Sequence, residues 1–271
     1  MTPHQVAHRR RVGPNGNVRL GAGLTRLGRP WGVRHAPVPC DAEAREFLVT
    51  AMALGVDVFD TAPSYGMSEE RLGAFLGTLG TEARSRVFVA TKFGEQWDAA
   101  SGAIVDHSYD ALARSLERSL RRLGTVDLIQ LHRTTSEALR SPDVRRAIAL
   151  ARASGRSAGV GASVSRVDDA RLALESLDAE WLEFPYHVAN TYMEEAFHLA
   201  QAHGARVLVN RPFGMGALVE ESPVEGAEAA FRFILAQQFS GVILSGTASP
   251  THLRENVAAF ARATRGELPG D

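Results

Sequence analysis

The stretch YDALARSLERSLRRLGTVDLIQL, residues 109–131, contains one copy of the unit from which most of this chain is built. Its apolar residues recur with a helical period from Tyr109 to Leu123 and then gather in the short run Asp127–Leu131, which predicts a helix followed by a strand. Helices and strands are expected to alternate in the same way on both sides of this stretch. Such alternation is typical of a parallel sheet, because each parallel strand must be reached through a crossover connection.

Eight strands are expected in all, each a short apolar run: Val18–Ala22, Val56–Phe59, Val87–Ala90, Asp127–Leu131, Ala158–Gly161, Trp181–Phe184, Arg206–Val209 and Val242–Leu244. Helical periodicity predicts helices between them, among them Asp41–Leu54 with Asp41 as N-cap, a helix capped by Ser68, one that runs through Ala153, Val167–Leu177, Met193–His203, Glu228–Gln237 and Pro250–Ala263. Eight strand–helix units in a chain of this length favour an α/β fold of the closed (β/α)8 type, a single TIM barrel, over an open doubly wound sheet.

The open-sheet alternative would place a glycine fingerprint between its first strand and a helix. Gly21, Gly23 and Gly28 lie near or after the end of the first predicted strand, but no helix opens directly on them, so this alternative is not favoured. No linker divides the chain. We therefore expect one catalytic barrel domain over residues 17–271, preceded by a flexible basic tail over residues 1–16.

The composition is that of an ordinary globular protein. Among 271 residues, 45% are hydrophobic and the net charge is −1, which disfavours a disordered chain and a nucleic-acid binder, since the latter needs excess positive charge. Cys40 is the only cysteine and the nine histidines lack metal-ligand spacing, so neither an internal disulfide nor a metal site is expected. No apolar stretch suits a membrane span and no signal core follows Arg11, so we expect a cytoplasmic protein with no membrane partner. The oligomeric state stays open.

Ionisable side chains stand where three adjacent predicted strands end, on the barrel face where active sites lie. The second strand is followed by Asp60 and then Tyr65, the third by Lys92, and the fourth by His132. Lys92 is the only lysine among 30 basic residues, and it follows an apolar run, where a solvated surface lysine is not expected. Taken singly, Asp60 could cap a loop, Tyr65 could pack on the rim and His132 could be a half-buried structural histidine.

Taken together, the four residues form an acid–base set that can move one proton on or off a carbonyl oxygen. A tyrosine with its ordinary pKa near about 10 exchanges protons poorly at neutral pH, and a nearby lysine cation lowers that pKa. An aspartate beside the lysine would keep it charged and in place. A histidine could orient a carbonyl or alcohol oxygen towards the tyrosine.

These segments resemble the signatures of the aldo-keto reductases. The similarity extends from about Val18 to Ala261 and is carried by Phe59–Gly66 with Ser68–Gly73, by Asp127–His132 after Ser119–Gly124, and by Ile243–Thr247 with Arg254–Asn256. The resemblance implies a (β/α)8 barrel, a nicotinamide cofactor bound without a Rossmann fold, and a catalytic tetrad of Asp60, Tyr65, Lys92 and His132. In the mechanism that it implies, hydride passes between nicotinamide C4 and the carbonyl carbon while Tyr65 transfers the proton.

The predicted cofactor pocket departs from the family pattern at several positions. Val164 follows Ser163 where the family usually has asparagine, Glu183 replaces a glutamine, and Asn210 stands where an aromatic residue usually stacks on the nicotinamide. The resemblance nevertheless assigns cofactor binding to Ser163, Glu183, Arg211, Gly246, Thr247, His252 and Asn256. Arg211 could bind phosphate through paired hydrogen bonds, and the pair Ser249–Pro250 looks like a helix N-cap near which pyrophosphate could sit.

The choice between the two nicotinamide cofactors is left open by the same comparison. The family favours NADP(H). Gly246 and His252, however, stand where NADP-binding members place lysine or arginine, and Arg254 could compensate only if the helix turned it inwards. NAD(H) is therefore a serious alternative.

The expected partner is a small-molecule carbonyl or alcohol, and Trp31, Trp97 and Phe213 are expected to bind it because they lie in or near the longer loops. Since the departures from the family cluster around the cofactor, a second hypothesis is a non-redox acid–base enzyme (a dehydratase, lyase or epimerase) that uses Tyr65, Lys92 and His132. A third is a non-catalytic, cofactor-sensing or scaffold subunit, against which the intact tetrad argues.

Overall fold

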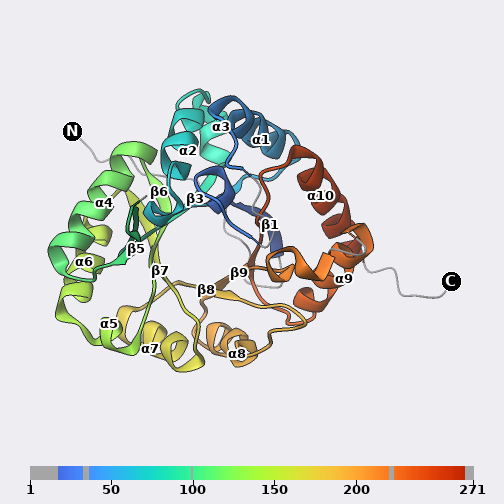
Figure 1. The fold of residues 1–271 in the computed structure, drawn as a ribbon. Coiled ribbons are helices and arrows are strands. Elements are labelled where there is room, and N and C mark those ends of the chain that lie inside the picture. The colour runs from blue at the N-terminus through green and yellow to red at the C-terminus, as the bar shows by residue number, and fades with distance from the viewer. Residues whose placement is uncertain (1–17, 33–36, 99, 220–222, 266–271) are drawn as a thin grey trace.

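The computed structural model describes residues 18–32, 37–98, 100–219 and 223–265. The basic tail expected over residues 1–16 lies outside these described residues. Parallel strands close into a barrel and helices form a ring around it (Figure 1). The predicted (β/α)8 barrel is thus confirmed.

The barrel strands follow one another around the barrel in chain order: β1 (Val18–Gly23), β2 (Val58–Asp60), β3 (Phe88–Phe93), β6 (Val126–Leu131), β7 (Ser157–Ser163), β8 (Trp181–Pro185), β9 (Arg206–Asn210) and β10 (Gly241–Ser245). The first and last strands pair in parallel, with Leu20 opposite Ile243, and this pairing closes the barrel. Closure removes the edges of this sheet, so each barrel strand has a paired neighbour on both sides.

The helices that surround the barrel are α1 (Asp41–Ala53), α2 (Ser68–Leu76), α3 (Thr81–Arg86), α4 (Tyr109–Leu123), α5 (Ser136–Arg140), α6 (Pro142–Ala153), α7 (Val167–Leu177), α8 (Glu194–Ala202), α9 (Pro223–Leu235) and α10 (Pro250–Arg265). The bounds expected for α4 and α7 are confirmed to the residue. At α10 the His252 amide donates to Ser249 Oγ at 3.3 Å, so the predicted N-cap is confirmed as well. In the described part of the chain, no helix combines the length and apolar character that a bilayer span requires.

Some local predictions were wrong. The N-cap of α1 is Cys40, whose amide donates to the Glu43 carboxylate at 2.7 Å, while Asp41 is the first helical residue; likewise Met67, and not Ser68, precedes α2. The segment expected as a loop after β3 contains a hairpin of β4 (Glu95–Asp98) and β5 (Gly102–Val105). These strands pair only with each other and expose much of their surface. The apolar residues of β5, Ile104 and Val105, are exposed, unlike those of the barrel strands.

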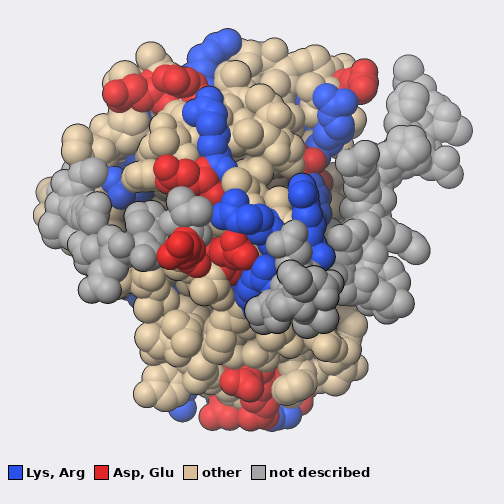
Figure 2. Space-filling model, turned by 90° about the vertical axis from the view of Figure 1, so that its right-hand side faces the viewer, with Lys and Arg blue, Asp and Glu red and all other residues tan. Residues whose placement is uncertain are grey.

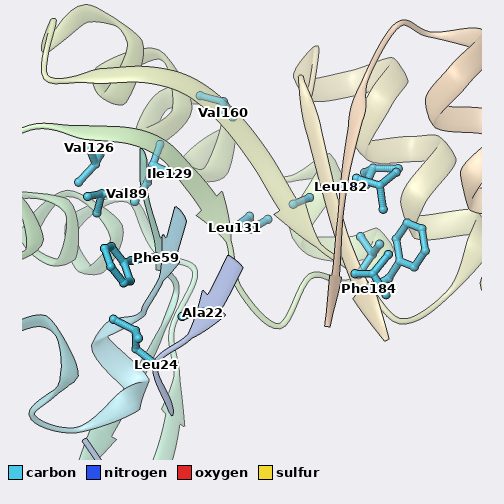
Figure 3. Packing of buried hydrophobic residues seen from close by; sticks show 14 of the residues in the cluster. Ala22, Leu24, Phe59, Val89, Val126, Ile129, Leu131, Val160, Leu182 and Phe184 are labelled. Atoms are coloured by element: carbon cyan, nitrogen blue, oxygen red, sulfur yellow. The ribbon is translucent and has the colours of Figure 1, made fainter. Parts of the chain in front are cut away.

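Alternate residues along the barrel strands belong to two different cores. An outer cluster, part of which Figure 3 shows, packs Phe59, Val89 and Ile129 between the strands and the helices. An inner cluster consists of strand residues alone, namely Val58, Ala90, Leu128, Trp181, Leu208, Val242 and Leu244. Side chains of a strand alternate between its two faces, so this division places the inner cluster inside the barrel.

Polar residues stand two positions further along five of these strands: Asp60, Lys92, Gln130, Glu183 and Asn210. Because the period of a strand is two, they point into the same barrel interior, nearer the carboxyl ends of the strands. We call these five residues the polar layer. The barrel is therefore filled with apolar side chains below and with hydrogen-bonding side chains above.

The surface of the molecule has no large region of one charge on the face drawn in Figure 2, where acidic side chains lie beside the basic ones. An example is Glu228, which forms ion pairs with Arg232 at 2.9 Å and with Arg262 at 2.6 Å. This pattern agrees with the net charge of −1 and gives no support to a nucleic-acid interface.

Gly28 fixes the turn that carries Tyr65. It follows the short helix η1 (Thr25–Leu27) and packs on η2 (Pro63–Tyr65), with its carbonyl accepting from the Met67 amide at 3.3 Å. A Cβ at position 28 would lie 1.7 Å from the Tyr65 carbonyl oxygen and 2.4 Å from the Ser68 nitrogen. The facing residue, Gly66, has φ +61°, and its own Cβ would lie 2.3 Å from the Gly28 oxygen. Only glycine allows the two backbones to come this close.

Gly28→Ala should therefore destabilise the fold by about 1–3 kcal/mol, because backbone atoms must move to admit the methyl group. Urea unfolding of the variant and the parent protein measures the change. Gly80→Ala is the matched control, since a Cβ at Gly80 would meet nothing within 4 Å. If the two variants are equally stable, the close approach at Gly28 does not constrain the Tyr65 turn.

Candidate active site

One buried ammonium group lies at the centre of the polar layer. Lys92 Nζ lies 2.6 Å from both carboxylate oxygens of Asp60 and 3.1 Å from Glu183 Oε2. Gln130 Nε2 bridges the two acids, at 2.8 Å from Glu183 Oε2 and 3.4 Å from Asp60 Oδ1, and Asn210 Nδ2 donates to Glu183 Oε1 at 2.8 Å. Residues from β2, β3, β6, β8 and β9 thus form one hydrogen-bonded network.

Two buried carboxyl groups share this single ammonium, and they cannot both ionise easily. Burial and the Glu183 carboxylate raise the pKa of Asp60 to about 8, although Lys92 opposes them. Burial also disfavours the ionised form of Glu183, but Lys92 and the Asn210 amide outweigh it and lower the Glu183 pKa. Near neutral pH the layer therefore retains a proton that isolated carboxylates would release.

Tyr65 stands beside this charge. Its ring lies 5.0 Å from Lys92 Nζ and 6.1 Å from the His132 ring, with the two rings nearly perpendicular. Burial raises the pKa of Tyr65 to about 12; Lys92 opposes this rise, while the Asp60 and Glu183 carboxylates add to it. The predicted lowering by lysine is present, but the predicted net direction was wrong. The phenol consequently stays protonated at neutral pH.

His132 is oriented by a carboxylate that the sequence analysis missed. Its Nδ1 lies 3.0 Å from Glu95 Oε2 and 3.3 Å from Ser64 Oγ. Burial lowers the pKa of His132, against the raising effect of Glu95, so the ring is neutral near pH 7. A carboxylate only accepts hydrogen bonds, so Nδ1 of the neutral ring carries the proton and Nε2 is left as an acceptor, which suits an alcohol hydroxyl.

Burial and contacts with neighbouring side chains hold the Glu95 carboxylate beside His132. It is buried at the start of β4, and its second oxygen, Oε1, accepts from Arg133 Nε at 2.8 Å. Burial disfavours the ionised carboxylate, but His132, Ser64 and Arg133 together lower the Glu95 pKa to about 2. Both oxygens of Glu95 therefore have partners, and the group is a carboxylate near neutral pH.

A cavity of about 590 Å³ opens over these groups, and Asp60, Tyr65 and His132 line it. All seven residues assigned to the cofactor line it as well: Ser163, Glu183, Arg211, Gly246, Thr247, His252 and Asn256. Arg254 is exposed on α10 and lies outside the cavity wall. The structure thus brings the tetrad and the predicted cofactor residues to one site.

The predicted substrate residues are placed less uniformly. Trp31 and Phe213 line the cavity, whereas Trp97 lies outside its wall, on β4, with 38% of its surface exposed. Trp97 contacts the site through Arg29, whose guanidinium carbon is 4.5 Å from the Trp97 ring centroid. Arg29, like Glu95 and Gln130, was missed by the sequence analysis.

Two local features suit a bound nicotinamide cofactor. Asn210 Oδ1 is buried and has no hydrogen-bond partner among the described residues, so a carboxamide N–H could donate to it. A Cβ at Gly246 would meet nothing within 4 Å, which leaves the cavity open beside the start of α10. Asn210 stands where the family usually has an aromatic residue, so this position offers an amide and not a stacking face.

Comparisons with known proteins point to one family. A sequence model of the aldo/keto reductase family matches residues 19–226. The chain is 27% identical to pyridoxal 4-dehydrogenase of Microbacterium luteolum, covering 92% of this chain and 93% of that protein. It is 26% identical to L-galactose dehydrogenase of Arabidopsis thaliana, covering 89% and 83%. A solved structure from Pseudomonas aeruginosa described as an aldo-keto reductase is 28% identical over 90% of both chains, with a TM-score of 0.76.

Replacing Glu183 with Gln tests the charge balance of the polar layer. Because the Asp60 pKa is raised, the folded state keeps a proton that the unfolded state releases, and the free energy of unfolding falls as the pH rises towards 8. Glu183→Gln removes the repelling carboxylate and should reduce this fall by about 1–3 kcal/mol between pH 6 and pH 8.

Urea unfolding at the two pH values measures the difference. Glu175→Gln, on the exposed face of α7, is the control and should follow the parent protein. If the free energy of unfolding falls equally between pH 6 and pH 8 in Glu183→Gln and in the parent, the two carboxyls do not compete for Lys92.

Proposed function

Since the chain belongs to the aldo-keto reductase family, we propose that it interconverts a carbonyl group and an alcohol with a nicotinamide cofactor, using Tyr65 as the proton donor and acceptor. The observation that carries this proposal is the position of the Tyr65 ring, between the buried Lys92 ammonium and the His132 imidazole and in the wall of the cavity. At this position the Tyr65 phenol can exchange one proton with one substrate oxygen.

The cofactor, when bound, supplies or accepts the hydride. In the reductive direction Tyr65 donates its proton to the substrate oxygen, and a pKa of about 12 keeps that proton available at neutral pH. Lys92 stabilises the phenolate that remains, because its ammonium is nearby and is kept charged by Asp60 and Glu183. In the oxidative direction the phenolate takes the proton back.

His132 orients the substrate oxygen in this proposal. Glu95 fixes its ring, so that the neutral form offers Nε2 to an alcohol hydroxyl, and the protonated form offers an N–H to a carbonyl oxygen. Because burial lowers the His132 pKa, the neutral form predominates near pH 7, and this form suits the alcohol substrate of the oxidative direction.

Family membership does not favour the two alternatives. The similar proteins are named dehydrogenases and aldo-keto reductases, which are oxidoreductases, and none of the named relatives is a lyase, dehydratase or epimerase. A scaffold role would not require the buried, fully paired acid–base groups that the polar layer contains.

Cofactor binding is assigned to the residues that line the other half of the cavity. Glu183 and Asn210 would face the carboxamide, Arg211 the pyrophosphate, and Asn256 the adenine end, where its Nδ2 already donates to Ser245 Oγ at 2.8 Å. The family favours NADP(H). Because Arg254 lies outside the wall, His252 is left to meet a 2′-phosphate, and NAD(H) remains the alternative.

Tyr65→Phe tests the role of the phenol. The variant should lose about 10²–10⁴-fold in kcat for aldehyde reduction, because it lacks the hydroxyl that is assigned to donate the proton. It should still bind the cofactor, which a fluorescence titration with NADPH and NADH in parallel measures, and the tighter nucleotide identifies the preferred one. Full turnover by the variant would remove Tyr65 from its assigned role. Absence of binding by either nucleotide in the parent protein would reject the oxidoreductase assignment.

A further inference from the structure

The guanidinium group of Arg29 lies at the cavity, away from the polar layer. The Arg29 guanidinium carbon is 4.9 Å from the centroid of the Trp31 ring and 4.5 Å from that of the Trp97 ring. Arg29 is half-buried and lines the cavity wall together with Tyr65. Two aromatic faces thus hold a guanidinium group beside the proposed proton donor.

No carboxylate among the described residues pairs with the Arg29 guanidinium. Arg71, Arg122 and Arg133 each form an ion pair, whereas Arg29 has no carboxylate partner among the described residues. Its Nε is buried without any hydrogen-bond partner in that part of the chain, and burial lowers its pKa. A desolvated cation without a partner is unfavourable, which indicates that something else pairs with it.

Glu95 does not serve as that partner. It is the acidic residue with the largest electrostatic effect on Arg29, but its two oxygens are occupied by His132 and Arg133. The guanidinium therefore retains donors that can turn to a molecule in the cavity.

The position of Arg29 separates it from the cofactor residues. Arg29 and Trp31 follow β1, and Trp97 lies on β4 after β3, whereas the residues assigned to the cofactor lie on or after β7, β8, β9 and β10. The Arg211 guanidinium carbon is 5.6 Å from the centroid of the Trp31 ring, so Trp31 borders both groups. Arg29 is thus on the side of the cavity left for the substrate.

We propose that Arg29 is a substrate-binding residue that selects carbonyl compounds or alcohols carrying an anionic group, a carboxylate or a phosphate, against the face held by Trp31 and Trp97. This inference rests on the proposed function, which defines the substrate as a carbonyl compound or an alcohol. A planar guanidinium offers two parallel N–H groups to such an anion, and the aromatic rings already fix its orientation, so little freedom is lost on binding.

The binding test follows tryptophan fluorescence, because two of the three tryptophans flank Arg29. The parent protein is titrated with benzoate and with benzamide, its neutral analogue of the same shape. Benzoate should bind at least about 10-fold more tightly, and Arg29→Gln should lose that advantage. Arg45→Gln, an exposed position on α1, is the matched control and should bind benzoate as the parent does. Arg29→Lys keeps the charge without the planar fork and should fall in between.

Arg211→Gln identifies the site of binding. If this variant, and not Arg29→Gln, loses benzoate, the anion occupies the phosphate region of the cofactor site and the proposal is overturned. Equal affinity of Arg29→Gln and the parent for benzoate overturns it as well.

A kinetic test uses 4-carboxybenzaldehyde and its uncharged methyl ester, methyl 4-formylbenzoate. The parent should show a kcat/KM at least about 10-fold higher for the acid, Arg29→Gln should lose this preference mainly through KM, and Arg45→Gln should keep it. Turnover of both aldehydes without preference overturns the proposal for Arg29. Turnover of neither counts against the proposed function instead, and the benzoate titration then decides the role of Arg29 by itself.

Discussion

The site depends on one buried ammonium held between two carboxyl groups. Lys92, Asp60 and Glu183 come from three different strands, and Asp60 and Glu183 stand on opposite parts of the barrel wall, so the contact exists only when the barrel is closed. An unpaired charge at this depth would destabilise the fold by several kcal/mol. The acid–base set is therefore assembled only in the closed barrel.

The alternation of side chains along a strand explains why this charge can be accommodated. Two residues before each member of the polar layer, the same strands contribute the apolar inner cluster, so one end of the barrel interior is sealed by packing. The other end opens into the cavity that Tyr65 and His132 line. Low polarity beneath the site strengthens every electrostatic effect above it, including the competition of two carboxyls for Lys92.

Much of the fold and the tetrad could be predicted from the sequence because both depend on local patterns. Helical period and short apolar runs located α4, α7 and the barrel strands, and ionisable residues directly after apolar runs identified Lys92 and His132. The hairpin after β3 could not be found, since its strands lack a buried face. Burial and partners across the barrel were also inaccessible: the direction of the Tyr65 pKa shift was predicted wrongly because burial raises this pKa, and the Asp60 and Glu183 carboxylates add to the rise. The period of two could have indicated Gln130, two residues after Leu128, whereas nothing in the sequence connects Glu95 with His132.

The most direct test of this account uses the fact that Lys92 is the only lysine in the chain. Protein labelled with lysine carrying ¹⁵N at Nζ gives a single side-chain NMR signal. Burial alone would lower the pKa of Lys92, but Asp60 and Glu183 raise it above the ordinary value of 10.5. The account predicts an ammonium signal that persists at pH 10.5 and shifts near pH 8, where the Asp60 carboxyl releases its proton. An Nζ that loses its proton below pH 10.5, with no change near pH 8, would contradict it.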